Sequence, residues 1–121
     1  MASPKTPSVL SFGRIVGDGA NNVIPNKVTI EGTFRTYDEV WRTEAIEKLT
    51  TLVKSIAEGM GAECIVDIPR GYPHLKNDVE LTNAMKKGAI DYLGSNNVVD
   101  LDLWMAAEDF AYYSQQNKAC F

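Results

Sequence analysis

The spacing of hydrophobic residues changes once between positions 27 and 60, and this change constrains the fold more than any other feature. From Lys27 to Arg35 apolar and polar residues alternate, which predicts a β-strand with one apolar face formed by Val28, Ile30, Gly32 and Phe34. After Thr36 the apolar residues step by three and four, which predicts a helix with an inner stripe of Ile46, Leu49, Val53, Ile56 and Met60. A strand followed by an amphipathic helix indicates an α+β fold.

Further elements are expected on both sides of this pair. Residues 9–16 are rich in β-branched and aromatic residues and predict a strand, and residues 64–68 predict another, ended by Pro69. Thr36-Tyr37-Asp38-Glu39 has the form of a capping box, so we expect the helix to begin there and to stop near Gly59 and Gly61. The order strand, strand, helix, strand defines a first unit over residues 7–69.

The second half begins after a predicted boundary at Arg70-Gly71-Tyr72-Pro73. A helix capped by Asn77 or Asp78 is expected to end at Gly94, followed by a strand over residues 98–104. A last helix is expected to open over residues 106–110, with its acidic residues in the first turn, where the helix dipole favours them. These elements predict a second unit over residues 70–121.

Composition excludes several classes of protein. The chain has 121 residues, of which 45% are hydrophobic and 23% charged, and a chain of this size can bury roughly two-thirds of its unfolded surface, enough for one core. A net charge of −4 with scattered basic residues argues against binding nucleic acid, and no apolar run approaches the roughly 20 residues of a membrane span. Two cysteines, Cys64 and Cys120, do not form a disulfide framework, which is typical of a cytoplasmic protein.

Three groups of residues could take part in binding, and each has a purely structural alternative. The loop from Gly17 to Asn22 is either a turn between strands or a loop that offers backbone N–H groups and an asparagine amide to a ligand. Arg35 is either a solvated strand charge or a guanidinium that grips a carboxylate through two hydrogen bonds. Glu108 and Asp109 either complement a helix dipole or form a site where a strand ends.

The residues predict no metal centre in this chain. His74 is the one histidine, it has no partner at ligand spacing, and it is expected to be an ordinary surface residue. A catalytic zinc site needs about three protein ligands. We therefore expect no metal ligand here.

Several motifs resemble a known family. Residues 11–15, 19–25 and 28–36 resemble the lid region of the M20 metallopeptidases, closest to the amidohydrolases that include hippurate hydrolases, N-acyl-amino-acid amidohydrolases and auxin-conjugate hydrolases. Met105-Ala106-Ala107-Glu108-Asp109-Phe110 resembles the Gly-Ser/Ala-Glu-Asp-Phe signature of that branch's catalytic domain. Asn77-Asp78 is a third matching point, and the order and spacing of the motifs agree with the family from about residue 9 to residue 121.

The resemblance implies a fold and a set of binding residues. Residues 7–69 would form most of a ferredoxin-like lid, an incomplete antiparallel sheet with helices on one face, and residues 70–121 would form part of an α/β zinc-peptidase-like catalytic domain. Asn22, in a loop with Gly19 and Ala20, would contact the substrate, and Arg35 would bind its free carboxylate. Glu108 and Asp109 would shape the floor of the active site.

The resemblance also implies the activity of a parent enzyme. Such an enzyme hydrolyses the amide bond of N-acyl amino acids with two divalent metal ions, zinc or similar, and forms a homodimer through its lid. Its metal ligands and general base would lie outside this chain, so the chain is predicted to be an internal fragment that is inactive alone. The alternative is a stand-alone α+β module for ligand binding or dimerisation, which would pack residues 98–110 into the same core as the rest of the chain.

Overall fold

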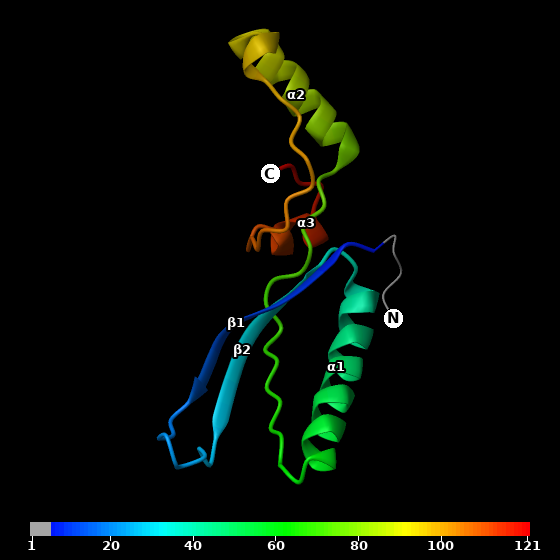
Figure 1. Ribbon diagram of the computed structural model, residues 1–121. Coiled ribbons are helices and arrows are strands. Elements are labelled where there is room, and N and C mark those ends of the chain that lie inside the picture. Colours follow the sequence, from blue (N-terminus) through cyan, green and yellow to red (C-terminus); the bar gives the residue numbers. More distant parts are fainter. Residues whose placement is uncertain (1–5) are drawn as a thin grey trace.

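The computed structural model describes residues 6–121, and the elements occur in the order strand, strand, helix, helix, helix. They are β1 (Ser8–Gly17), β2 (Val28–Thr36), α1 (Glu39–Gly59), α2 (Val79–Leu93), a short 3₁₀ turn η1 (Ser95–Asn97) and α3 (Ala111–Gln116). The molecule is elongated, with the two strands and α1 at one end, α2 at the other and α3 between them (Figure 1). The fold is α+β, as the spacing of hydrophobic residues predicts.

The two predicted strands form an antiparallel hairpin. Pairing runs from Ser8 opposite Thr36 to Gly17 opposite Val28, with a β-bulge at Gly13. Before the bulge Leu10 lies opposite Phe34, and after it Ile15 lies opposite Ile30, which gathers the apolar residues on one face. The bulge therefore keeps the apolar sides of the two strands in register.

Gly32 lies at a position of β2 where a side chain would collide with β1. A Cβ atom at this position would lie 2.4 Å from the carbonyl oxygen of Ser11 and 2.7 Å from Cδ1 of Phe12. The missing side chain leaves space for the ring of Phe12, which lies opposite Gly32 in the pairing. The glycine of the predicted apolar face is therefore a packing requirement.

Helix α1 follows the hairpin, but the predicted capping box is wrong. The cap is Asp38, whose Oδ1 accepts hydrogen bonds from the backbone N–H groups of Val40 and Trp41, both at 2.9 Å. The hydroxyl of Thr36 instead donates to the carbonyl of Pro7 and so ties the chain ahead of β1 to the end of β2. An ionised carboxylate directly before the first helical residue displaces the more distant hydroxyl from the cap position.

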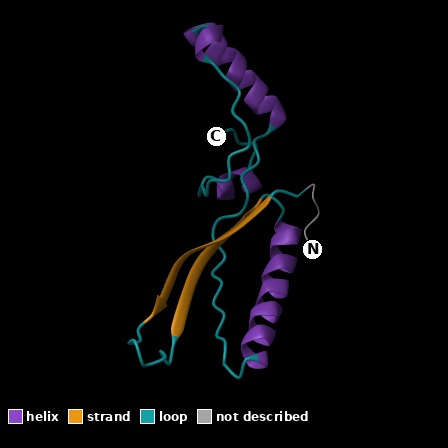
Figure 2. Ribbon diagram, in the orientation of Figure 1, coloured by secondary structure: helices purple, strands orange, loops and turns teal. Residues whose placement is uncertain are grey.

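The predicted strand over residues 64–68 is wrong. After Gly61, with φ of +75°, the chain returns along α1 in an extended form, and Figure 2 draws this stretch as loop. Cys64, Val66 and Ile68 are half-buried whereas Ile65 is 89% exposed, so the side chains alternate as in a strand. A strand also needs a backbone partner, and the sheet of the described residues contains β1 and β2 alone.

Helix α2 confirms the helix predicted between residues 77 and 94. Asp78 is its cap, with Oδ1 accepting from the N–H of Leu81 at 2.9 Å, and the helix ends at Gly94, where φ is +86°. Asp78 also donates its backbone N–H to the carbonyl of Ala119 at 2.8 Å. This bond places the start of α2 beside the end of the described chain.

The strand predicted over residues 98–104 is wrong, and the last helix begins later than predicted. Leu101, Leu103 and Trp104 are about four-fifths exposed, and no regular structure forms until α3 opens at Ala111. Residues 98–110 join neither a separate sheet nor a common core within the described chain. A hydrophobic run with nothing to pack against gains no burial energy, so its β-propensity alone does not form a strand.

The chain does not bury the core that its length allows. Ala111 and Ala119 are the buried apolar residues of the described chain. The accessible surface is 10169 Å², whereas a compact monomer of this mass exposes roughly 6,500 Å². The chain alone therefore leaves an excess of roughly 3,700 Å², much of it apolar, on the hairpin, α1 and residues 98–104. Among the described residues no helix combines the length and apolar character needed to cross a membrane.

Candidate functional site

Arg35 lies where the two family-like motifs meet. It is exposed near the end of β2, and its Nη1 donates a hydrogen bond to the carbonyl oxygen of Met105 at 2.6 Å, across 70 residues of sequence. The contact brings β2 next to the stretch from Met105 to Phe110. A guanidinium has five N–H donors, and this bond uses one of them, so the group keeps the capacity to bind a carboxylate.

The paired carboxylates lie in the turn before α3, outside its first helical turn. Glu108 is half-buried, and its Oε1 accepts from the backbone N–H of Phe110 at 3.3 Å. Asp109 is exposed, and its carbonyl accepts from the N–H of Tyr112 at 3.0 Å. Glu108 therefore stabilises the local turn, and the role of both residues in shaping an active site stays a prediction.

The loop between the strands closes around two asparagines. Ala20 and Val23 exchange two backbone hydrogen bonds of 3.0 and 3.1 Å, which places Asn21 and Asn22 at the tip. Gly19 allows this closure, because a Cβ there would lie 2.6 Å from the carbonyl oxygen of Val23. The backbone amide of Ala20 is thus engaged within the loop, whereas the side chains of Asn21 and Asn22 are exposed, and contact of Asn22 with a substrate stays a prediction.

Asn22 and Arg35 lie at opposite ends of the hairpin. The loop joins the strands beyond the pair Gly17–Val28, whereas Arg35 pairs with Val9 near the open end. Arg35 lies seven positions after Val28 along β2, which at 3.3 Å per position is roughly 23 Å. A small ligand bound at Arg35 therefore cannot reach Asn22 of the same chain.

The described residues do not provide a metal centre. No group of three or more histidine, cysteine, aspartate or glutamate side chains converges within residues 6–121. His74 is half-buried and donates its backbone N–H to Oε1 of Glu39 at 3.1 Å, so it is less exposed than expected. Cys64 and Cys120 are free thiols. The donor set that two divalent ions need is therefore not met by these residues.

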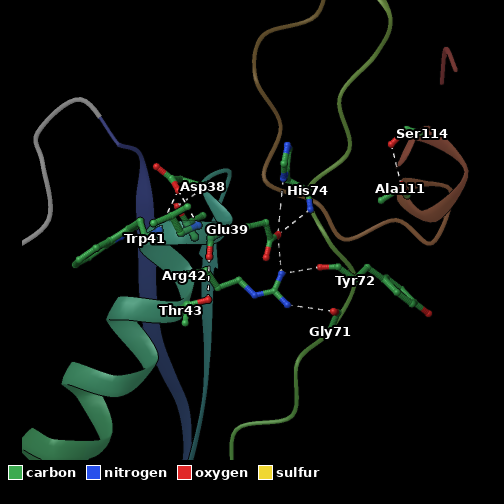
Figure 3. A network of polar contacts seen from close by, with 12 residues as sticks. Asp38, Glu39, Trp41, Arg42, Thr43, Gly71, Tyr72, His74, Ala111 and Ser114 are labelled. Atoms are coloured by element: carbon green, nitrogen blue, oxygen red, sulfur yellow. Dashed lines mark hydrogen bonds and ion pairs between the residues drawn. The ribbon is translucent and has the colours of Figure 1, made fainter. Parts of the chain in front are cut away.

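The polar network around Arg42 was not among the sites predicted from the sequence. Its guanidinium binds the carbonyl oxygens of Gly71 and Tyr72 as well as the carboxylate of Glu39 (Figure 3). These partners are up to 30 residues away in sequence, and no motif or periodicity connects them. A concave region of about 540 Å³ lies elsewhere, between the start of α2 and residues 114–119, and its lining includes neither Arg35 nor Asn22.

Comparison with known proteins identifies relatives over almost the whole chain. YhaA of Bacillus subtilis, a protein assigned as an amidohydrolase, is 33% identical over 119 residues, which is 98% of this chain and 30% of YhaA. N-acetyl-L-cysteine deacetylase of the same organism is 31% identical over 119 residues, 98% of this chain and 28% of the relative. A search of family models finds no match.

A solved structure agrees with the sequence relatives. The crystal structure of a protein assigned as an aminohydrolase, from methicillin resistant Staphylococcus aureus, matches with a TM-score of 0.73 and 28% identity, over 97% of this chain and 30% of that one. The chain spans about 30% of the length of the relatives it matches. Along almost its entire length the chain is thus similar to one part of the amidohydrolases, which confirms the resemblance inferred from its motifs.

Proposed function

We propose that this chain is the substrate-holding part of a longer amidohydrolase, which hydrolyses the amide bond between an acyl group and an amino acid in a metal-dependent reaction. The observation that carries the proposal is the contact between Arg35 and Met105, which joins the two family-like motifs at an exposed guanidinium. The relative named N-acetyl-L-cysteine deacetylase supports the substrate class, because N-acetyl-L-cysteine is an N-acylated amino acid.

In this proposal Arg35 binds the free carboxylate of the substrate. A planar guanidinium pairs with a carboxylate through two parallel hydrogen bonds, which fixes the orientation of the ligand as well as its position. The bond to Met105 holds the guanidinium three residues before Glu108 in the sequence, at the start of the stretch that carries both carboxylates. The chain's own contribution is confined to binding and orienting the substrate.

The catalytic groups would come from outside the chain. Hydrolysis of an amide needs an activated water and a base that takes its proton. The described residues supply no donor set for metal ions, so the metal ions expected of the longer enzyme would be held by other segments. We therefore expect residues 1–121 alone to bind N-acyl amino acids weakly and not to hydrolyse them. We also propose a cytoplasmic location for the protein, because Cys64 and Cys120 are free thiols and thiols stay reduced in that compartment.

A homodimer would reconcile the positions of Asn22 and Arg35. Since one ligand cannot contact both residues of a single chain, we propose that Asn22 reaches the ligand from a second copy. The excess surface of roughly 3,700 Å² exceeds a standard protein–protein interface and leaves room both for such a contact and for the rest of the enzyme. The same excess disfavours the alternative of a stand-alone binding module, since such a module would cover its own apolar surface.

A binding experiment tests the role of Arg35. N-acetyl-L-alanine and N-acetyl-L-alaninamide, which lacks the carboxylate, are titrated against the chain by NMR. Hydrogen bonds to charged groups contribute about 1.5–3 kcal/mol, so Arg35→Met is expected to weaken binding of the acid roughly 10- to 150-fold and to leave the amide unaffected. Arg14→Met is the matched control, because Arg14 lies on the other strand of the same hairpin in an exposed ion pair with Glu31. Equal binding of acid and amide would contradict the proposal.

A further inference from the structure

Residues 70–74, which join the two halves of the chain, are hydrogen-bonded to the first turns of α1. The guanidinium of Arg42 donates from Nη2 to the carbonyl of Gly71 at 3.2 Å and from Nη1 to the carbonyl of Tyr72 at 2.9 Å. Nη1 also donates to Oε1 of Glu39 at 3.0 Å, so a carboxylate one turn earlier in the helix orients the group (Figure 3). Two consecutive carbonyls of the joining segment therefore meet one positive charge.

Two further hydrogen bonds attach neighbouring residues of this segment to α1. The same Oε1 of Glu39 accepts the backbone N–H of His74 at 3.1 Å. One residue before the carbonyl pair, Arg70 donates from Nη2 to the hydroxyl of Thr43 at 2.8 Å. Residues 70–74 are thus fixed to α1 at four positions, although the sequence predicts only a boundary there.

Burial distinguishes this network from the other ion pairs of the chain. The side chain of Arg42 is 13% exposed, whereas the side chains of Arg14 and Glu31 are 62% and 54% exposed. Solvent competes less for the hydrogen bonds of Arg42, and bonds from an ionised donor are stronger than neutral ones. The hydrogen bonds of Arg42 should therefore be more stable than the exposed ion pair of Arg14 with Glu31.

Residues 70–74 also contact the C-terminal half of the chain. The ring of Tyr72 packs edge-on against the ring of Tyr112 in α3, with centroids 6.0 Å apart and planes at 84°. Helix α3 directly follows the stretch that begins at Met105, and Met105 accepts the hydrogen bond from Arg35. The position of Met105 relative to Arg35 therefore depends on where residues 70–74 are held.

We propose that Arg42 is a positioning residue, which holds residues 70–74 on α1 and thereby keeps residues 105–110 next to Arg35. Its guanidinium is engaged by Glu39 and by the carbonyls of Gly71 and Tyr72 of the chain itself. Arg42 thereby makes residues 70–74 a segment of fixed position instead of a flexible linker between the two halves. The proposal goes beyond the function proposed above, because it concerns the relative position of two parts of the chain and holds whatever ligand Arg35 binds.

The test is the substitution Arg42→Met, which keeps the length of the side chain and removes its donors. Spin labels on the two native cysteines, Cys64 beside α1 and Cys120 near the end of the chain, report the distance between the halves by pulsed electron paramagnetic resonance. Hydrogen exchange of the His74 amide reports the junction itself. Arg14→Met is the matched control, since it removes the same charge from an exposed pair.

We expect Arg42→Met to broaden the distance distribution and to speed exchange of the His74 amide about tenfold, and Arg14→Met to change neither. Unchanged exchange and an unchanged distribution with α1 intact by circular dichroism would overturn the proposal. If Arg42→Met unfolds α1, Arg42→Lys decides, because an ammonium keeps the charge near Glu39 but lacks the planar fork that meets two carbonyls. Faster exchange in Arg42→Lys with α1 intact supports the proposal, and wild-type exchange overturns it.

Discussion

Replacing Gly32 with alanine tests whether the hairpin is packed as the structure describes. The new Cβ would lie 2.4 Å from the carbonyl oxygen of Ser11, a backbone atom that cannot move without disturbing the pairing of β1 with β2. It would also lie 2.7 Å from Cδ1 of Phe12, so the ring would have to leave its place. Inserting a methyl group into such a contact costs about 1–3 kcal/mol.

Gly13 provides the matched control in the opposite strand. A Cβ at Gly13 meets no atom within 4 Å, and Gly13 is not among the glycines with positive φ. Gly13→Ala is therefore expected to be neutral or to stabilise the hairpin by about 0.4–1 kcal/mol, since it restricts the unfolded chain. Gly32→Ala should therefore destabilise the hairpin, whereas Gly13→Ala should not.

Hydrogen exchange of the paired hairpin amides measures this difference. A loss of about 1.4 kcal/mol corresponds to tenfold faster exchange, so Gly32→Ala should speed exchange of these amides by roughly 5- to 150-fold. Gly13→Ala should leave exchange unchanged or slow it. Equal rates in the two variants, or slower exchange in Gly32→Ala, would refute the close approach of the strands at this pair.

Further predictions concern the ends of α2 and the activity of the chain. Asp78→Ala removes the cap bond to Leu81 and should destabilise α2 by about 1 kcal/mol. The change should appear as a loss of helical NMR chemical shifts, which Asp78→Asn should largely avoid. Unchanged shifts in the alanine variant would contradict the capping role of Asp78. Gly94→Ala forces a side chain into φ of +86° and ψ of 148°, which should cost about 1–3 kcal/mol and lower the thermal midpoint; an unchanged midpoint would argue against this backbone geometry. Residues 1–121 with added zinc should release no amino acid from N-acetyl-L-alanine, and release in proportion to the concentration of the chain would show that the catalytic groups lie within it.

Local patterns predicted the elements that contact one another. The alternation over residues 27–35 and the stripe after Thr36 each describe an element with a partner, since β1 pairs with β2 and α1 contacts β2. The helix capped at Asp78 and ended at Gly94 was also predicted, because a carboxylate at the start and a glycine at positive φ act over a few residues. Signals of this range need no information about the rest of the molecule.

Predictions that depend on distant partners failed. Residues 64–68 keep the side-chain alternation of a strand but lack a backbone partner, and residues 98–104 lack both a partner and burial. The same limit applies to Arg42, whose partners at residues 71 and 72 no local pattern connects with the helix. Strand formation and side-chain networks of this kind are decided by tertiary contacts.

For the candidate site, the sequence proposes a set of residues but does not predict their arrangement, and their roles stay predictions. The family resemblance selected Arg35, Asn22 and Glu108 from motifs, and the structure joins Arg35 to Met105. A spacing of thirteen positions between Asn22 and Arg35 does not reveal that the hairpin places the two residues at opposite ends. Asn22 and Arg35 can therefore contact one ligand only if they come from two copies of the chain.

The most direct test of the account is an assay of the polypeptide that the gene produces, compared with residues 1–121. We expect the longer protein to release amino acids from N-acyl amino acids and residues 1–121 not to do so. Arg35→Met in the longer protein should lower kcat/KM for substrates with a free carboxylate roughly 10- to 150-fold. An active longer protein in which Arg35→Met leaves kcat/KM unchanged would remove Arg35 from substrate binding. A longer protein without hydrolase activity on N-acyl amino acids would contradict the proposed function itself.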